Sequence, residues 1–312
     1  HLFAIGYNKE EEKITNSYYD LLASEARLIS YLAICKREVP KEHWFKLGRA
    51  LSEACGRQGL VSWTGTMFEY FMPPLVMKHY PATLLHETYR TVLKAQKLYG
   101  DRRGVPWGTS ESGYYAFDLQ LNYQYKAFGV PDLGLKRGLI EDMVVSPYST
   151  LLALPFTPQE AMANIRRLLK DGLEGEYGLY EAVDYTPERL PAGEHRKVVA
   201  SFMAHHLGMS LAAINNLLHD GVLQRRFHAN PLIRSGEILL EEKVPARAII
   251  TKDYKEEVHP LTAGEKETVD FARSVEVTGT RELPHCHLLS NGRYSLLLTE
   301  GGSGYSRREG IQ

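Results

Sequence analysis

Glu25 is the first residue whose setting points to chemistry, because it stands among apolar residues in a stretch predicted to be helical. Residues 16–36 show a helical apolar pattern, and Glu25 shares one face with five apolar neighbours at −4, −3, +3, +4 and +7: Leu21, Leu22, Leu28, Ile29 and Leu32. A carboxylate is rarely buried without a partner or a purpose. Two interpretations stay open: a structural ion pair with an arginine of another helix, or a carboxylate in a functional cleft.

Glu111 is the second candidate. Residues 105–115 predict a loop leading into a helix, with Ser110 or Ser112 as the cap and Glu111 near the helix N-terminus. An acid at that position is often only a capping group. Aromatic neighbours favour a sugar subsite instead, where a ring stacks on the sugar and a carboxyl group hydrogen-bonds or protonates an oxygen. These neighbours are Trp107, Tyr114 and Tyr115.

Two further stretches combine acids with aromatic rings. Residues 177–187 and residues 63–70 both lie in or next to predicted loops. Either one alone is compatible with an ordinary polar turn, but several such loops in one helical protein favour a shared site. The candidate binding residues in the aromatic–acidic stretches are Trp63, Glu69, Trp107, Tyr114, Tyr180, Glu181, Asp184 and Tyr185.

His205 and His206 are the remaining polar pair of interest. Adjacent helical residues point about 100° apart, so the two rings do not share a metal-binding face as residues four apart do. His195 and His219 add no ligand spacing, and we expect His205 and His206 to be core or subsite residues. Phosphate-binding, dinucleotide and serine-hydrolase motifs are absent from the sequence, so we expect neither a cofactor nor a metal.

The overall composition excludes some classes of partner. Lys plus Arg number 37 and Asp plus Glu 38, which leaves no electrostatic footprint for nucleic acid or an anionic membrane. The three cysteines, Cys35, Cys55 and Cys286, form no framework and indicate a reducing compartment. No apolar run approaches the roughly 20 residues of a membrane helix. The chain begins at His1 within sequence that has a folded pattern, so we expect a piece of a longer protein.

Helices must position most of these residues. The apolar periodicity and the Gly and Pro punctuation predict helices at 16–36, 42–55, 67–72, 81–99, 114–128, 147–154, 158–171, 195–218 and 230–242. The helix at 195–218 is apolar on several sides, which predicts burial and favours an α/α toroid or another large helical array. After Pro245 the pattern changes to strands at 246–252, 273–280 and 293–299. We therefore expect a mostly α domain over 1–245 and the start of a β-domain over 246–312.

Several long motifs resemble one family. They are YYDLLASEAR at 18–27, PWGTSESGY at 106–114, LNYQY at 121–125, YEAVDYT at 180–186 and MAHHLGM at 203–209. Together they resemble the glycoamylase-like domain of bacterial cyclic β-1,2-glucan synthases, from about Leu2 to about Pro245. LSNGRYS at 289–295 and GGSGYSR at 301–307 resemble the opening of the β-sandwich in the phosphorylase-like module that follows it in those synthases.

The resemblance implies an (α/α)6-type toroid, whose N-terminal helices would precede His1, that closes linear β-1,2-glucan into a ring by transglycosylation. Its catalytic pair would be Glu25 and Glu111, with the aromatic–acidic residues above, His205 and His206 binding substrate. A retaining pair lies about 5 Å apart. Glu111 is the preferred acid/base and Glu25 the preferred nucleophile by analogy with related glucanases, although the expected local environments favour the reverse.

The family also implies the setting of the domain. It would be a cytoplasmic part of a synthase anchored in the inner membrane through other segments, with a β-1,2-glucan chain and the neighbouring modules as partners. Two alternatives remain: an endo-β-1,2-glucanase that hydrolyses the same polymer, and a glucan-binding fragment without activity of its own.

Overall fold

The chain divides into two compact units, His1–Gly264 and Glu265–Gln312. The computed structural model describes residues 2–117, 122–244, 250–252, 261, 286–291, 293–299 and 302–308. The expected strand at 273–280 lies outside these residues. The expected boundary after Pro245 stays a prediction, although β14 (Ile250–Lys252) pairs in parallel with β5 (Leu51–Ala54) of the first unit.

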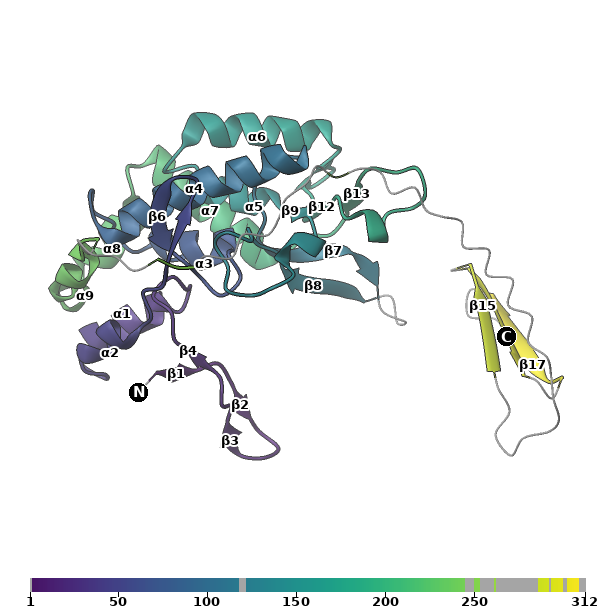
Figure 1. Ribbon diagram of the computed structural model, residues 1–312, viewed down its shortest axis with the longest axis horizontal. Helices are drawn as coiled ribbons and strands as arrows, with labels where there is room; N and C mark the ends of the chain where they lie inside the picture. Colours follow the sequence, from purple (N-terminus) through teal and green to yellow (C-terminus); the bar gives the residue numbers. More distant parts are fainter. Residues whose placement is uncertain are drawn as a thin grey trace. The chain divides into compact units, whose positions relative to one another are not determined.

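Helices form the centre of the first unit (Figure 1). The long helix α4 (Leu84–Arg103) starts at Thr83, whose hydroxyl accepts from the His86 amide, and ends at the left-handed Gly104. A salt bridge of 2.7 Å from Lys97 to Glu160 links α4 to α6 (Pro158–Lys170). The short helices α3 (Met67–Phe71) and α5 (Pro147–Leu152) contact each other, and α5 also packs on α7 (Ala204–Leu218).

The remaining helices lie at one end of this unit in Figure 1. They are α1 (Arg27–Cys35), α2 (Glu42–Lys46), α8 (Val222–Ala229) and α9 (Pro231–Ser235). The Tyr31 hydroxyl donates to the Ile233 carbonyl at 2.7 Å and so ties α1 to α9. Single 3-10 turns occupy Pro73–Leu75, Leu139–Glu141, Pro187–Arg189 and Glu237–Glu241.

Short strands connect the helices. Antiparallel pairs are β1 (Phe3–Ala4) with β4 (Tyr18–Tyr19), β2 (Tyr7–Asn8) with β3 (Lys13–Ile14), β7 (Glu111–Phe117) with β8 (Tyr123–Ala127), and β10 (Glu174–Gly175) with β11 (Gly178–Leu179). In one three-stranded sheet β5 lies between β14 and β6 (Arg57–Leu60). In another, β12 (Ala182–Asp184) lies between β9 (Val144–Val145) and β13 (Lys197–Val199). In the second unit, β15 (Cys286–Ser290), β16 (Tyr294–Thr299) and β17 (Gly304–Arg308) form an antiparallel sheet.

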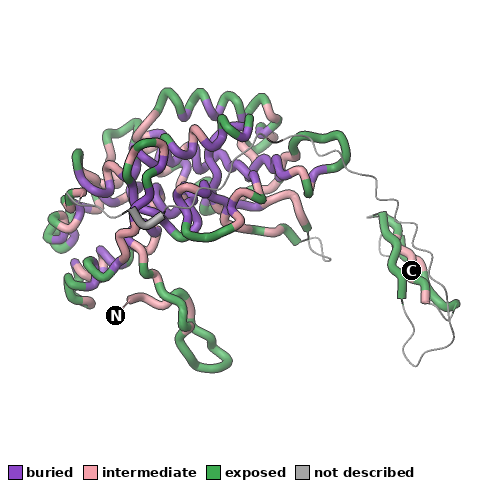
Figure 2. The backbone as a smooth tube through the Cα atoms, in the orientation of Figure 1, coloured by how far each residue is buried: buried purple, intermediate pink, exposed green. Residues whose placement is uncertain are grey.

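Buried residues concentrate between the helices, whereas the β2–β3 arm is largely exposed (Figure 2). The largest fully buried side chains include Trp44, Tyr31, Tyr70 and Tyr148, together with one charged residue, Arg27. The Arg27 guanidinium donates to the main-chain oxygens of Ser24 (2.9 Å) and Glu69 (2.8 Å). A buried cation therefore joins the start of α1 to α3 through polar main-chain atoms.

The structure corrects the expectation of a mostly α domain. Helices are confirmed near 67–72, 147–154 and 158–171. The helix expected at 114–128 is instead the β7–β8 pair, since its Tyr-rich sequence suits a strand. The 42–55 stretch ends in β5, where Cys55 (φ 57) and Gly56 (φ 70) make the tight turn of a hairpin with β6.

Other helices differ in length or surroundings. Only the second half of 16–36 is helical, and 195–218 begins as strand β13 before α7. The helix expected at 230–242 is α9 followed by a 3-10 turn, and α8 was not predicted. The expected all-round burial of α7 is also wrong, since Leu207, Leu211 and Leu218 are exposed. A toroid stays a prediction.

Two helical glycines give a matched test of the packing. Gly100 lies inside α4, and a Cβ there would stand 3.0 Å from the Trp107 N, Cα and Cβ atoms. Gly208 lies inside α7, and its Cβ would meet nothing within 4 Å. We expect Gly208→Ala to raise the free energy of unfolding by about 0.5–1 kcal/mol. Gly100→Ala should lower it, because Trp107 main-chain atoms resist displacement. Denaturant unfolding measures both changes, and a higher free energy of unfolding in both variants than in the parent would contradict this packing.

Candidate active site

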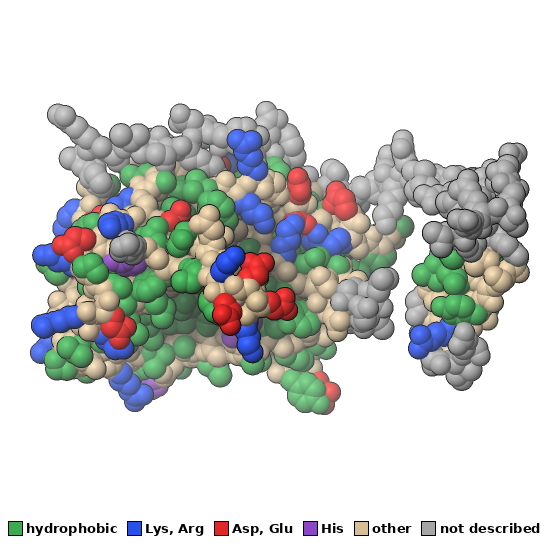
Figure 3. Space-filling model, turned by 90° about the horizontal axis from the view of Figure 1, so that it is seen from below, with side chains coloured by type: hydrophobic (Ala, Val, Ile, Leu, Met, Phe, Trp, Pro, Cys, Tyr) green, Lys and Arg blue, Asp and Glu red, His purple; other side chains and the backbone are tan. Residues whose placement is uncertain are grey.

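A cavity of about 550 Å³ lies where the β1–β4 stem meets the segments before α1 and α3. Its lining includes four acidic residues, Asp20, Glu25, Glu69 and Glu111, and further residues from the stem and the loop at Trp63. Figure 3 views the side from which the β2–β3 arm projects in Figure 1, and the surface of this face is hollowed beside the arm. The two carboxylates predicted to act together therefore line one cavity.

Glu25 reaches the cavity from a turn, not from a helix face. It lies just before α1, and the preceding segment is extended because the Leu22 amide donates to the Gly48 carbonyl at 3.0 Å. The expected apolar stripe is therefore wrong, and Ile29 is exposed. The Ser24 hydroxyl donates to Glu25 Oε2 at 3.1 Å. Among the described residues no basic side chain forms an ion pair with Glu25, so the structural ion pair is not found there.

Glu111 is the first residue of β7, so the expected position at a helix N-terminus is wrong. Helices hold the segment that precedes it. Gln96 of α4 exchanges hydrogen bonds of 3.0 Å with the main chain of Thr109. Tyr148 of α5 donates to Ser110 Oγ at 2.7 Å and to the Glu111 carbonyl at 2.9 Å. These contacts fix the main chain of Glu111 while its side chain lines the cavity.

Glu69 has a different role from Glu25 and Glu111. It is 5% exposed, and its two oxygens accept from the hydroxyls of Ser62 (2.9 Å), Thr64 (2.8 Å) and Thr66 (2.8 Å) and from the amides of Trp63 (3.0 Å), Thr64 (3.0 Å) and Thr66 (2.9 Å). With Thr66 it completes the capping box of α3. So many donors leave it no free lone pair for a sugar, and its contribution to the cavity is a fixed negative charge.

Burial and the mutual repulsion of carboxylates change the proton affinity of Glu25 and Glu111. Burial raises the pKa of Glu111 to about 7, and the charges of Glu25 and Glu69 add to the rise. Burial also raises the pKa of Glu25, with a further contribution from Glu69, while its own amide and the Ser24 hydroxyl oppose the rise. Burial and both candidate carboxylates raise the pKa of the Tyr19 hydroxyl. Near neutral pH this site can therefore hold one proton on its carboxyl groups.

Aromatic residues border the cavity. Trp63, predicted to bind substrate, lines it and is 60% exposed, so its ring offers a flat apolar face to a sugar. Tyr18 and Tyr19 of β4 also line it and were not predicted as site residues. Their position next to Asp20 in the 18–27 motif was the available signal.

Trp107, Asp184 and Tyr185 lie elsewhere and serve the core. Trp107 is 5% exposed and its main chain is held by Asn164 of α6 at 3.1 and 2.7 Å. Asp184 is fully buried and accepts from Arg189 Nε at 2.7 Å. The Tyr185 hydroxyl donates to Asp171 at 2.5 Å. None of the three lines the cavity described above.

Tyr114 and Tyr180 are half-buried in aromatic contacts. The Arg189 guanidinium lies 4.8 Å from the centre of the Tyr114 ring, and Tyr180 packs against Phe202 at 5.4 Å between ring centres. Glu181 and His206 are each 3% exposed and hydrogen-bond each other at 3.0 Å, whereas His205 is exposed. The structure therefore brings Glu25, Glu69, Glu111 and Trp63 together and places the other predicted residues outside this cavity.

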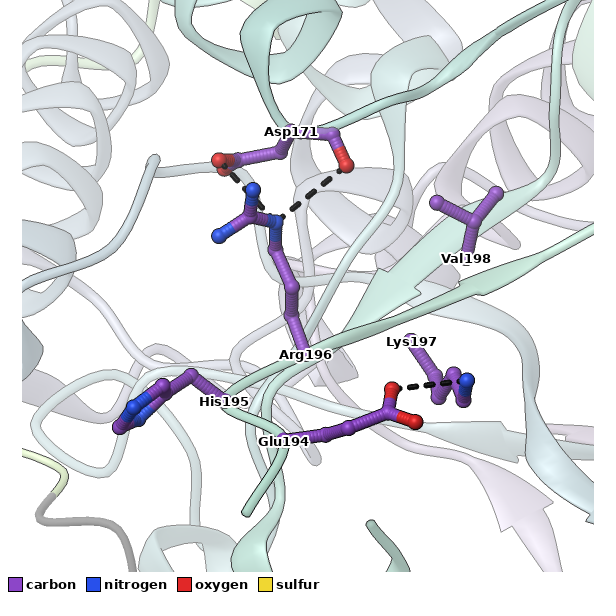
Figure 4. Close-up of a pocket in the computed structure, with 6 residues that line it drawn as sticks. All are labelled: Asp171, Glu194, His195, Arg196, Lys197 and Val198. Atoms are coloured by element: carbon purple, nitrogen blue, oxygen red, sulfur yellow. Dashed lines mark hydrogen bonds and ion pairs between the residues drawn. The ribbon is translucent and has the colours of Figure 1, made fainter. Parts of the chain in front are cut away.

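A second, shallower pocket of about 480 Å³ lies along β13 (Figure 4). Its charged side chains are paired with one another: Arg196 with Asp171 at 3.4 Å, and Lys197 with Glu194 at 2.7 Å. In the part of the chain that the structure describes, no group of three or more acidic, His or Cys side chains is placed to hold a metal ion. Within the same residues no helix has the length and apolar character needed to cross a membrane.

Comparison with known proteins places these features in a family. A family model named Glycoamylase, described as "Putative glucoamylase", matches residues 17–231. The cyclic beta-(1,2)-glucan synthase NdvB of Rhizobium meliloti (strain 1021) is 45% identical over 309 residues, which is 99% of this chain and 11% of that protein. The chain thus spans about a tenth of the length of this curated relative.

Two solved structures share the fold. A putative glucoamylase from Bacteroides caccae ATCC 43185 superposes with a TM-score of 0.55 at 18% identity, and an endo-beta-1,2-glucanase from Chitinophaga pinensis, in complex with sophorotriose and glucose, with a TM-score of 0.56 at 17% identity. Each alignment covers 77% of this chain and 59% of the other. At these identities the likeness establishes the fold alone.

The hydrogen bonds of Glu69 predict a large stability effect. Glu69→Gln should lower the free energy of unfolding by about 2–4 kcal/mol, because an amide NH2 group would face donors that now point at a carboxylate oxygen. The exposed Glu53 of β5 supplies the control, Glu53→Gln, which should change stability by less than about 0.5 kcal/mol. Equal effects of the two substitutions in urea unfolding would show that Glu69 does not hold this loop.

The raised pKa of Glu111 predicts a pH-dependent stability effect. A carboxyl group whose folded pKa lies near 7, above its ordinary 4.5, favours folding below pH 4.5 and loses that contribution as the pH rises through 7. Glu111→Gln should therefore be more stable than the parent at pH 8, by on the order of 2–3 kcal/mol, and similar to it at pH 4. Thermal unfolding at both pH values checks this, and a variant less stable than the parent at pH 8 would contradict it.

Proposed function

The chain belongs to the glycoamylase family, and we propose that it acts on linear β-1,2-glucan by retaining transglycosylation, closing a part of the glucan chain into a ring. One observation carries the proposal: Glu25 and Glu111, both with raised pKa values, line one cavity beside an exposed tryptophan. The identity to a cyclic β-1,2-glucan synthase supports glucan as the substrate class. Attachment to an inner membrane and to neighbouring modules remains a prediction.

The proposed chemistry uses the two carboxyl groups as a unit. One carboxyl group donates its proton to the glycosidic oxygen as the C1–O bond breaks, and the other carboxylate forms an ester with C1. The reducing-end segment of the glucan leaves with that proton, as a shorter chain that carries a free C2 hydroxyl. The C2 hydroxyl at the far end of the same chain then attacks C1, the ester bond breaks, and the hydroxyl proton returns to the first carboxyl group. No water is consumed, and both carboxyl groups return to their initial state.

A site that holds one proton on two carboxyl groups suits this sequence of steps. Burial and the fixed charge of Glu69 oppose ionisation of both groups at once, so an acid and a carboxylate can coexist near neutral pH. Trp63 and the stem tyrosines Tyr18 and Tyr19 offer rings on which glucose units can stack. Hydrolysis would follow if water replaced the sugar hydroxyl in the second step.

Substitution of either carboxylate tests the proposal. Glu25→Gln and Glu111→Gln should each lower the rate on linear β-1,2-glucan by at least about a hundredfold, because one variant loses the proton donor and the other loses the carboxylate that forms the ester. Mass spectrometry distinguishes the products, since a ring lacks one water relative to the linear chain. The control Glu53→Gln should keep the parent rate.

Two results would contradict the proposal in different ways. If both Gln variants kept the parent rate, the pair would not be catalytic. If the parent released only new reducing ends and formed no rings, the reaction would be hydrolysis and the transfer step would be wrong.

A further inference from the structure

Glu181 and His206 were expected to bind substrate, but both are 3% exposed. Glu181 Oε1 accepts from the Gly113 amide at 3.0 Å, and Glu181 Oε2 lies 3.0 Å from His206 Nδ1. The other ring nitrogen, His206 Nε2, lies 3.1 Å from the Tyr125 hydroxyl. The buried Glu181–His206 pair is therefore hydrogen-bonded to Tyr125, which is 39% exposed.

With Glu181 ionised and His206 neutral, the chemistry of these groups sets the direction of their hydrogen bonds. An ionised carboxylate only accepts, so His206 Nδ1 must carry the hydrogen that points at Glu181. In a neutral imidazole Nε2 then has a lone pair and no hydrogen, and it accepts from the Tyr125 hydroxyl. The single hydrogen of Tyr125 is thus used inside the protein, and the lone pairs of its oxygen remain for an outside donor.

The His206 ring has little freedom to rotate. It stacks on the Tyr148 ring at 3.7 Å between centres and 11° between planes. Tyr148 is the residue that donates to the carbonyl of Glu111 at 2.9 Å. The group that orients Tyr125 is therefore fixed to the same main chain that carries a candidate catalytic carboxylate.

The strand register places Tyr125 on the same face as Glu111. Gly113 pairs with Tyr125 and Glu111 with Ala127, and residues two apart on a strand share a face. Tyr125 and Glu111 are therefore diagonal neighbours, a distance that a tyrosine side chain can bridge. In agreement with this, burial raises the pKa of the Tyr125 hydroxyl, and the charges of Glu111 and Glu181 raise it further.

We propose that Tyr125 is a substrate-binding residue whose oxygen accepts a hydrogen bond from a glucose hydroxyl next to Glu111, and that His206 and Glu181 are positioning residues that hold it in the accepting state. The proposal rests on the proposed glucan activity. It adds a specificity: this subsite takes a sugar that presents a hydroxyl donor there and disfavours one that presents only an acceptor.

Binding to a catalytically silenced protein tests the proposal without relying on turnover. Calorimetry would measure the affinity of linear β-1,2-gluco-oligosaccharides for the Glu111→Gln protein with and without Tyr125→Phe. Tyr125→Phe keeps the ring and removes only the hydroxyl, so it should weaken binding about tenfold. Tyr123, exposed on the same strand, provides the matched control, Tyr123→Phe, which should leave the affinity unchanged.

The positioning role needs a double-mutant cycle. In Glu181→Gln the amide can donate to His206 Nδ1, which lets Nε2 carry the hydrogen and point it at Tyr125. Glu181→Gln should therefore weaken binding about as much as Tyr125→Phe, and the two changes together should weaken it little more than either alone. Fully additive effects would overturn the positioning role, because a general structural defect adds to the loss of a hydroxyl.

The outcomes separate this proposal from the proposed function. If Tyr125→Phe bound oligosaccharide as tightly as its parent, the Tyr125 proposal would be wrong, whatever the activity of the carboxylate variants. If Glu111→Gln kept full activity, the catalytic pair would be wrong, whereas a tenfold loss of affinity in Tyr125→Phe would still support the binding residue.

Discussion

The carboxylate of Glu69 is the group on which the rest of the site depends. It accepts from three hydroxyls and three amides of the segment between Ser62 and Thr66, and it caps α3. This one buried charge orders the loop that presents Trp63 to the cavity. Burial is the main cause of the raised pKa values of Glu25 and Glu111, and the charge of Glu69 adds to both, so the residue that fixes the shape of the site also contributes to its proton affinity.

A second set of buried polar contacts positions the main chain that leads into Glu111. Gln96 and Tyr148 hold the main chain that leads into Glu111, and Tyr148 also stacks on His206. None of these groups reaches the cavity lining described above. Helices α4 and α5 therefore act on the site through hydrogen bonds to the main chain, which explains why a helical core can hold a site built on turns and strand ends.

The sequence identified the carboxylates better than the elements that carry them. Glu25 and Glu111 line one cavity as predicted, yet one lies in a turn and the other begins a strand. Apolar periodicity could not reveal this, because Leu22 is held by a main-chain bond to Gly48 and residues 111–127 form the antiparallel β7–β8 pair in place of a helix. Glu181, Asp184 and His206 illustrate a second limit: a polar residue in an aromatic stretch can serve either a ligand or a buried network, and only burial distinguishes the two.

The central claim is that Glu25 and Glu111 share one proton near neutral pH above the fixed charge of Glu69. A carbon-13 NMR titration of the glutamate side-chain carboxyl groups would measure this directly, with Glu111→Gln used to assign the signal. The account predicts a carboxyl group that titrates near pH 7 in the parent and is missing from the variant. If the signal that disappears in Glu111→Gln titrated near its ordinary value of 4.5 in the parent, Glu111 would be ionised at neutral pH and the account would be wrong.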